Sequence, residues 1–112
     1  MQITSTQHEQ VTVVALNGSI DAASAREITE HLTSQINSGN VRLVLDLAQV
    51  AFMSSAGLRT ILTAIKECRQ HGGDLRVAAA RGEVERTLNL SGFTSILSLF
   101  PTAAEALAGF NA

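Results

Sequence analysis

Residues 41–71 place a run of strand-forming apolar residues directly before a segment with the spacing of an amphipathic helix. The run "VRLVLDL" (41–47) is rich in leucine and β-branched residues. This composition is typical of a central strand that is covered on both faces. In the segment that follows, apolar residues recur every three or four positions, at Leu58, Ile61, Leu62, Ile65 and Cys68. The spacing predicts a helix over 55–71, and a buried strand that leads into such a helix is typical of an α/β fold.

The same alternation of strand and helix patterns extends over the rest of the chain. Strands are predicted up to Leu16, over 75–80 and, more weakly, over 94–100. Helices are predicted over 22–37, 83–92 and 101–110. Together the segments indicate an α/β domain with a mixed, mostly parallel sheet of about four to five strands, flanked by about four helices. The first strand or strands are expected to pair antiparallel at the edge of the sheet.

Length and charge narrow the classes of function. The chain has 112 residues, of which 46% are hydrophobic and 16% charged, so a single globular domain over 1–112 is expected. Its formal net charge is −2, and its basic residues are scattered. Because nucleic-acid binders usually gather lysine and arginine on one face, neither DNA nor RNA is expected as a partner.

The N-terminal sequence has none of the features of a targeting or membrane segment. "MQITSTQHEQVTVVAL" (1–16) has no basic region, which argues against a signal peptide. Nowhere does an apolar run approach the roughly 18 residues that a spanning helix needs. Cys68 is a lone cysteine and cannot form an internal disulfide. We therefore expect a cytoplasmic protein with no membrane insertion.

Motifs for enzymatic chemistry are missing from the sequence. It has no Gly-Lys-Ser/Thr phosphate-binding loop and no G-x-S-x-G motif, and a lone cysteine cannot build a zinc site. The three histidines, His8, His31 and His71, are expected to have surface roles. The sequence therefore predicts a protein that is not an enzyme and that holds no cofactor and no metal.

Two adjacent serines stand where the central strand gives way to the helix, in "FMSSAGLRTIL" (52–62). Functional sites of parallel α/β sheets tend to lie at such junctions. The simplest structural role for a serine there is to cap the helix by accepting a hydrogen bond from a free backbone N–H. One cap requires one hydroxyl, so the pair Ser54 and Ser55 leaves one serine for another role.

The central motif gives these serines a specific context. "LVLDLAQVAFMSSAGLRTIL" (43–62) resembles the core signature of the STAS family, the fold of bacterial anti-sigma factor antagonists. That signature is a strand, D-L-x-x-V-x-F, two small polar residues, S/A-G-L and a helix. "VTVVALNGSIDAASA" (11–25) and the segment 71–107 also fit the family pattern, so the resemblance covers essentially the whole chain.

The resemblance implies a function in partner switching. In antagonists of this family, a GHKL-type serine kinase that is also an anti-sigma factor phosphorylates a serine at the start of the motif helix. The unphosphorylated antagonist binds this kinase and releases a sigma factor, and a PP2C-type phosphatase restores the active form. By position, the implied acceptor is Ser55, with Ser54 as the alternative. The family often has Asp where this chain has Ser54, and Ser or Thr where it has Ala56.

Further residues around the serines are implied in partner binding. The resemblance gives Asp21 a partner contact, although an Asp before "AASAREI" is equally suited to cap a helix. Arg59 follows Ser55 by four residues, so it can pair with a phosphate there or simply solvate an exposed face. The complete predicted set is Asp21, Ser54, Ser55, Ala56, Gly57 and Arg59.

A second function is compatible with the same resemblance. A STAS domain can be a scaffolding or docking subunit, for example of a transporter ATPase, in which no serine is modified. Co-purification of such an ATPase, without a kinase, would favour that function.

Overall fold

The structure is a computed structural model that describes residues 1–110 of the chain. Within this range the chain forms five strands, namely β1 (Gln2–His8), β2 (Val11–Ile20), β3 (Arg42–Met53), β4 (Asp74–Ala78) and β5 (Leu99–Phe100). It also forms four helices, namely α1 (Ala22–Asn37), α2 (Ser55–Gln70), α3 (Gly82–Asn89) and α4 (Ala103–Phe110).

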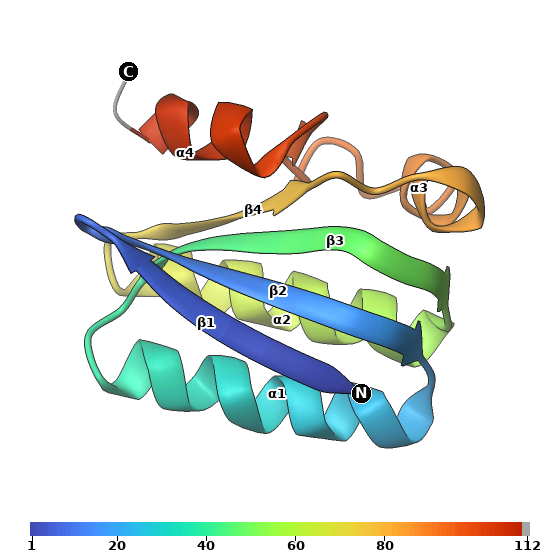
Figure 1. Cartoon of the computed structure of the whole chain (residues 1–112), viewed down its shortest axis with the longest axis horizontal. Coiled ribbons are helices and arrows are strands. Elements are labelled where there is room, and N and C mark those ends of the chain that lie inside the picture. The colour runs from blue at the N-terminus through green and yellow to red at the C-terminus, as the bar shows by residue number, and fades with distance from the viewer. Residues whose placement is uncertain (111–112) are drawn as a thin grey trace.

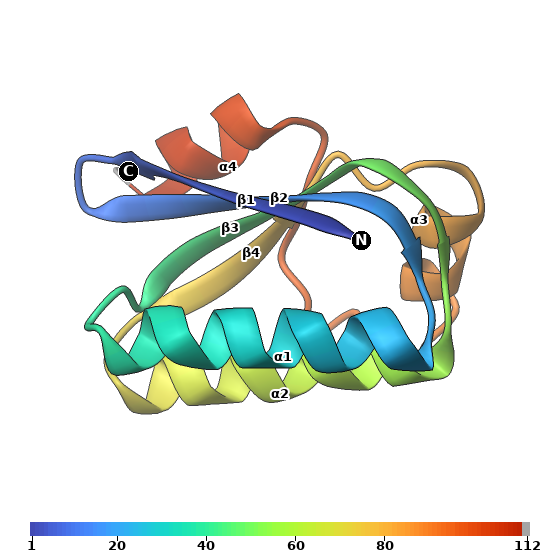
Figure 2. The ribbon, with the colours of Figure 1, turned by 60° about the horizontal axis from the view of Figure 1, so that its bottom comes forward.

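The strands form one mixed sheet in the order β1-β2-β3-β4-β5. The β1–β2 pair is antiparallel and each of the other neighbouring pairs is parallel. Helices α1 and α2 lie side by side on one face, α4 covers part of the other face, and α3 lies near the carboxyl end of β3 (Figures 1 and 2). The predicted mixed α/β sheet with an antiparallel edge is therefore confirmed.

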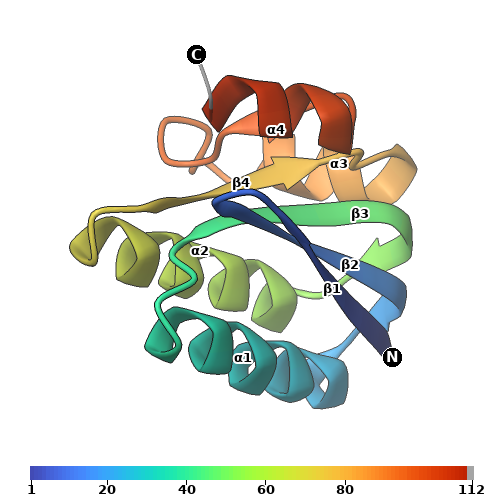
Figure 3. The same ribbon diagram turned by 60° about the vertical axis from the view of Figure 1, so that its left-hand side comes forward.

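The core lies mainly between the sheet and the α1–α2 pair. Strand β3 is central, and Leu43, Leu45 and Leu47 contribute fully buried side chains to this cluster. Val44, on the opposite face, belongs to a smaller cluster under α4. The run 41–47 is therefore covered on both faces, as its composition predicts. Figure 3 shows the two helical layers above and below the sheet.

The predicted helices over 22–37 and 55–71 are confirmed, with α2 ending at Gln70. Four predictions about strands were wrong in extent, among them the strand over 75–80, which runs over Asp74–Ala78. The strand expected to end near Leu16 continues to Ile20, and β3 continues beyond Leu47 to Met53. In the segment 94–100 only Leu99–Phe100 pair as a strand, and Thr94–Ile96 form a turn.

Polarity explains the strand that the pattern analysis did not delimit. In β1 every residue except Ile3 is exposed, so its sequence has no buried alternating face. Its strand conformation depends on pairing with β2, from Gln2 opposite Asn17 to His8 opposite Val11. The extent of such an edge strand is determined by pairing with its partner strand rather than by its own hydrophobic pattern.

Candidate functional site

The carboxyl ends of β2 and β3 bring two helix starts together. The register places Ile20 opposite Met53, and the backbone N–H of Ser54 donates to the carbonyl of Ile20 at 2.8 Å. Helix α1 begins two residues after Ile20, and α2 begins one residue after Ser54. The exposed Asp21 and Ser55 therefore stand on either side of one backbone hydrogen bond.

Asp21 caps α1. Its carboxylate accepts from the Ser24 N–H at 3.0 Å, and the Ser24 hydroxyl accepts from the Asp21 N–H at 2.9 Å, which completes a capping box. The hydrogen bond from the Ser24 backbone is the main cause that lowers the pKa of Asp21. The capping role that the sequence allowed is thus present, and partner contact by the exposed carboxylate stays a prediction.

The two serines occupy different environments. Ser54 is half-buried, and its hydroxyl accepts from the Gly57 N–H at 3.3 Å, which makes it the N-cap of α2. Ser55 is the first helical residue, it is exposed, and its hydroxyl makes no hydrogen bond within residues 1–110. One serine therefore holds the helix start in place, while the other presents a free hydroxyl.

Gly57 allows α2 to start close to the sheet. A Cβ at this position would lie 2.5 Å from Ile20 Cγ2 and 3.0 Å from Met53 Cγ. Both atoms belong to residues that pair at the carboxyl ends of β2 and β3, and Ser54 directly follows Met53. Gly57 is buried, and its neighbour Ala56 is half-buried against the core, so within the predicted set these two residues position the serines.

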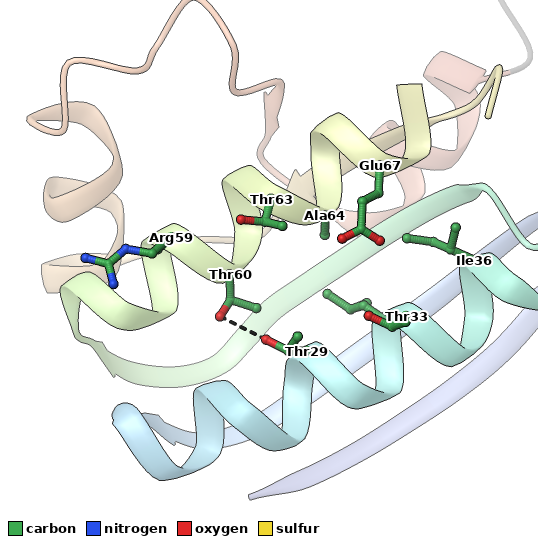
Figure 4. A pocket seen from close by; sticks show the side chains of 9 residues that line it. Thr29, Thr33, Ile36, Arg59, Thr60, Thr63, Ala64 and Glu67 are labelled. Atoms are coloured by element: carbon green, nitrogen blue, oxygen red, sulfur yellow. Dashed lines mark hydrogen bonds between the residues drawn. The ribbon is translucent and has the colours of Figure 1, made fainter. Parts of the chain in front are cut away.

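Arg59 lies one turn after Ser55 on α2. Its side chain is exposed and forms no hydrogen bond or ion pair in the described part of the chain. Figure 4 shows the guanidinium extending toward the amino-terminal end of α2, the direction in which helical side chains usually lean. This orientation leaves the guanidinium free to approach an anion at the helix start.

A groove between α1 and α2 was not found from the sequence. Its walls carry four threonines, and the hydroxyls of Thr29 and Thr60 lie 3.2 Å apart across it (Figure 4). The threonine pairs recur at helical spacing, Thr29 with Thr33 and Thr60 with Thr63, which is the one signal that the sequence offers.

Groups with reactive or metal-binding chemistry do not gather elsewhere in residues 1–110. No cluster of three His, Cys, Asp or Glu residues in that range could hold a metal ion. Cys68 is buried, and desolvation raises the pKa of its thiol to about 12. In the same range no helix combines the length and apolarity that crossing a membrane requires.

Comparison with known proteins places the chain in a family. Residues 2–106 match the STAS domain family. A Bordetella bronchiseptica protein assigned as anti-sigma factor antagonist BtrV is 34% identical over 103 residues, which cover 92% of this chain and 86% of that protein. The anti-sigma-F factor antagonist RsfB of Mycobacterium tuberculosis is 31% identical, with 96% of this chain and 87% of RsfB covered.

Solved structures share the whole fold. An anti-sigma factor antagonist from Mycobacterium paratuberculosis matches at a TM-score of 0.90 and 27% identity, with 99% of this chain and 94% of that chain covered. The Bacillus cell fate determinant SpoIIAA in its phosphorylated form matches at a TM-score of 0.75 and 17% identity, covering 97% and 99% of the two chains. From its sequence and its fold, this chain belongs to the STAS domain family, and it is of the anti-sigma factor antagonist type.

Proposed function

We propose that this protein acts in the cytoplasm as an anti-sigma factor antagonist that is switched by phosphorylation of Ser55. The unphosphorylated form binds a GHKL-type serine kinase that is also an anti-sigma factor, and this binding releases a sigma factor. Phosphorylation ends the binding, and a PP2C-type phosphatase restores it. Residues 1–112 act as a single STAS domain that works by binding, without turnover of its own.

The observation that carries the proposal is the contrast between the two serines. The Ser54 hydroxyl is engaged in capping and half-buried, whereas the Ser55 hydroxyl is exposed and free of hydrogen bonds within residues 1–110. A kinase must bring its nucleotide to the acceptor oxygen in line for phosphoryl transfer. Ser55 meets this requirement without any change in the fold, which supports it over Ser54 as the acceptor.

The fold can tolerate a phosphate at this position. Ser55 is the first residue of α2, where unpaired N–H groups and the helix dipole favour an anion. The start of α1 lies beside it through the hydrogen bond between Ser54 and Ile20. A phosphate adds about −1.5 to −2 charges at neutral pH, so its main effect falls on the partner's surface rather than on the stability of the domain.

The surface of this chain around Ser55, which would contact a partner, carries both signs of charge. Asp21 is exposed and its pKa is lowered, so it is a carboxylate at neutral pH, and Arg59 is an exposed cation. A partner that fits the free hydroxyl beside Asp21 would meet added negative charge and bulk after phosphorylation. We assign Asp21 to partner contact on this ground, and Arg59 to pairing with the phosphate.

Phosphoryl transfer from radioactive ATP tests the proposal. Purified GHKL-type anti-sigma factors of the source organism should label the wild type and Ser54→Ala, but not Ser55→Ala. Label retained in Ser55→Ala and lost in Ser54→Ala would move the acceptor to Ser54. If no such kinase labels or binds the wild type, and a transporter ATPase co-purifies with it instead, the docking function is favoured.

A further inference from the structure

Phe52 is a large apolar side chain that the fold turns into solvent three residues before Ser55. It is 52% exposed, whereas the neighbouring core residues Val50 and Met53 are 0% and 4% exposed. Within residues 1–110 the other exposed large hydrophobics are Leu90, Phe93 and Leu99, all in the segment from the end of α3 to β5. Phe52 is therefore the one member of this group on the β3–α2 junction.

An irregularity in the sheet produces this exposure. Gly18 pairs with Val50 and Ile20 pairs with Met53, so one residue of β2 stands opposite both Ala51 and Phe52. With strict alternation after the inward Val50, Ala51 would point outward and Phe52 inward. The extra residue instead leaves both Ala51 and Phe52 exposed and returns Met53 to the core. Bulges of this kind re-aim a side chain beside a functional site.

Within residues 1–110 the end of β3 that carries Phe52 has no strand on its β4 side, but α3 contacts β3 there, and Arg81 Nε donates to the Ala48 carbonyl at 2.8 Å. Pairing with β4 stops at Asp46 opposite Ala78, while β3 continues to Met53 (Figure 1). Phe52 is 52% exposed despite this contact, and Asp21 and Ser55, which follow the ends of β2 and β3, are also exposed, so a protein that approaches this end of the sheet can reach all three.

We propose that Phe52 is an apolar anchor for the kinase that phosphorylates Ser55, and that it inserts into a pocket on that protein. This inference rests on the proposed function, because it assigns the contact to the partner that must reach the Ser55 hydroxyl. Phe52 and Ser55 are three residues apart, so their Cα atoms lie at most about 11 Å from each other. A standard interface buries about 800 Å² on each partner, so a kinase centred on Ser55 also covers Phe52.

The chemistry of the surface fits such an anchor. The predicted contact residues around Phe52 are short or charged, so it supplies the large apolar area that they lack. Buried aromatic side chains surrounded by a polar rim carry most of the binding energy in many interfaces. Phosphorylation of Ser55 would then weaken kinase binding, because it adds a hydrated dianion next to an interface whose affinity depends on burying the Phe52 ring.

The inference is tested by measuring how tightly purified variants bind the kinase that labels the wild type, with ADP in place of ATP so that no phosphate is transferred. Phe52→Ala should weaken the affinity for the kinase by about tenfold or more. Phe52→Tyr, which keeps an aromatic ring, should retain most of the wild-type affinity. Leu99→Ala is the control, because Leu99 pairs with Val77, which pairs with Leu45, and Leu45 lies seven residues before Phe52. Seven residues span about 23 Å along a strand, so this variant should bind as the wild type does.

Three other outcomes overturn the inference. Equal affinities of Phe52→Ala and the wild type for the kinase would remove the anchor and leave the proposed function standing. Absence of kinase binding by the wild type would overturn both. If the wild type sediments as a dimer, Phe52→Ala sediments as a monomer, and both bind the kinase with equal affinity, the ring contacts a second copy of this chain. Thermal unfolding of each variant checks that the exposed substitution leaves the fold intact.

Discussion

The backbone N–H of Ser54 donates to the carbonyl of Ile20 at 2.8 Å, and this one bond ties the start of α2 to the end of β2. Asp21 follows Ile20 and Ser55 follows Ser54, so two residues far apart in sequence are placed beside each other by backbone geometry alone. The site is therefore built into the parallel pairing of β2 and β3 and needs no mobile loop to assemble it.

The first prediction concerns the close contact that this pairing requires at Gly57. Gly57→Ala should destabilise the protein by about 1–3 kcal/mol, because the new Cβ would lie 2.5 Å from Ile20 Cγ2. Chemical denaturation measures the loss. Combining it with Ile20→Ala, which removes the opposing atom, should give less than the sum of the two single effects. Additive losses would mean that α2 does not pack on Ile20 in this way.

The second prediction separates the two serines by stability. Ser54→Ala removes the hydroxyl that accepts from the Gly57 N–H, so it should lower the free energy of unfolding by about 1 kcal/mol. Ser55→Ala removes a hydroxyl without a hydrogen bond in residues 1–110 and should change stability by less than about 0.5 kcal/mol. Urea denaturation of both variants makes the comparison, and a larger loss for Ser55→Ala would reverse the assignment of the cap.

The third prediction is a pH effect at Asp21. Hydrogen bonds from Ser24 lower the pKa of this carboxyl below its ordinary 3.8 in the folded protein. A lowered folded pKa contributes stability above the unfolded pKa, and this contribution is lost as the pH falls through the folded value. Thermal unfolding of the wild type should therefore lose stability below about pH 4.

Asp21→Asn is the matched control, because asparagine also caps helices but does not titrate. Near pH 7 it should be almost as stable as the wild type, and on acidification it should lose less stability. Parallel acid dependence of the two proteins would show that Asp21 is not held by Ser24 in solution.

The fourth prediction uses Cys68. Its thiol is buried and its pKa is raised to about 12, mainly by desolvation. At pH 8 the folded protein should therefore react with a thiol reagent far more slowly than the protein in urea, since the thiolate is the nucleophile. Rapid reaction of the native protein would mean that the end of α2 opens readily.

Periodicity could predict the two long helices and the central strand, because Ile28, Leu32, Ile61 and Ile65 mark the buried stripes directly. It could not predict where β3 ends. Beyond Leu47 the alternation is broken by irregular pairing with β2, at Ala15–Asn17 and again at Gly18–Ile20. A bulge depends on the partner strand, so its position is not written in either strand alone.

The arrangement of the candidate site could be predicted in part. The motif indicated Ser54 and Ser55, and the cap at Ser54 follows from its place before the helix. The proximity of Asp21 to the serines depends on strand pairing, and the steric need for Gly57 depends on Ile20, so neither contact can be read from local sequence. The exposure of Phe52 contradicts simple alternation after the buried Val50, and it became visible only from the register.

The last prediction concerns Arg59, one helical turn from Ser55 and without an ion-pair partner in residues 1–110. A guanidinium four residues after a phosphoserine can form a charge-assisted pair with it. Arg59→Ala should therefore change the rate at which a PP2C-type phosphatase dephosphorylates the protein, or weaken binding of the kinase, while leaving the free energy of unfolding within about 0.5 kcal/mol. Lys66→Ala, two turns further along the exposed side of α2, is the matched control and should leave both measurements unchanged. If Arg59→Ala keeps the wild-type dephosphorylation rate and affinity, Arg59 serves only to solvate the exposed face of α2.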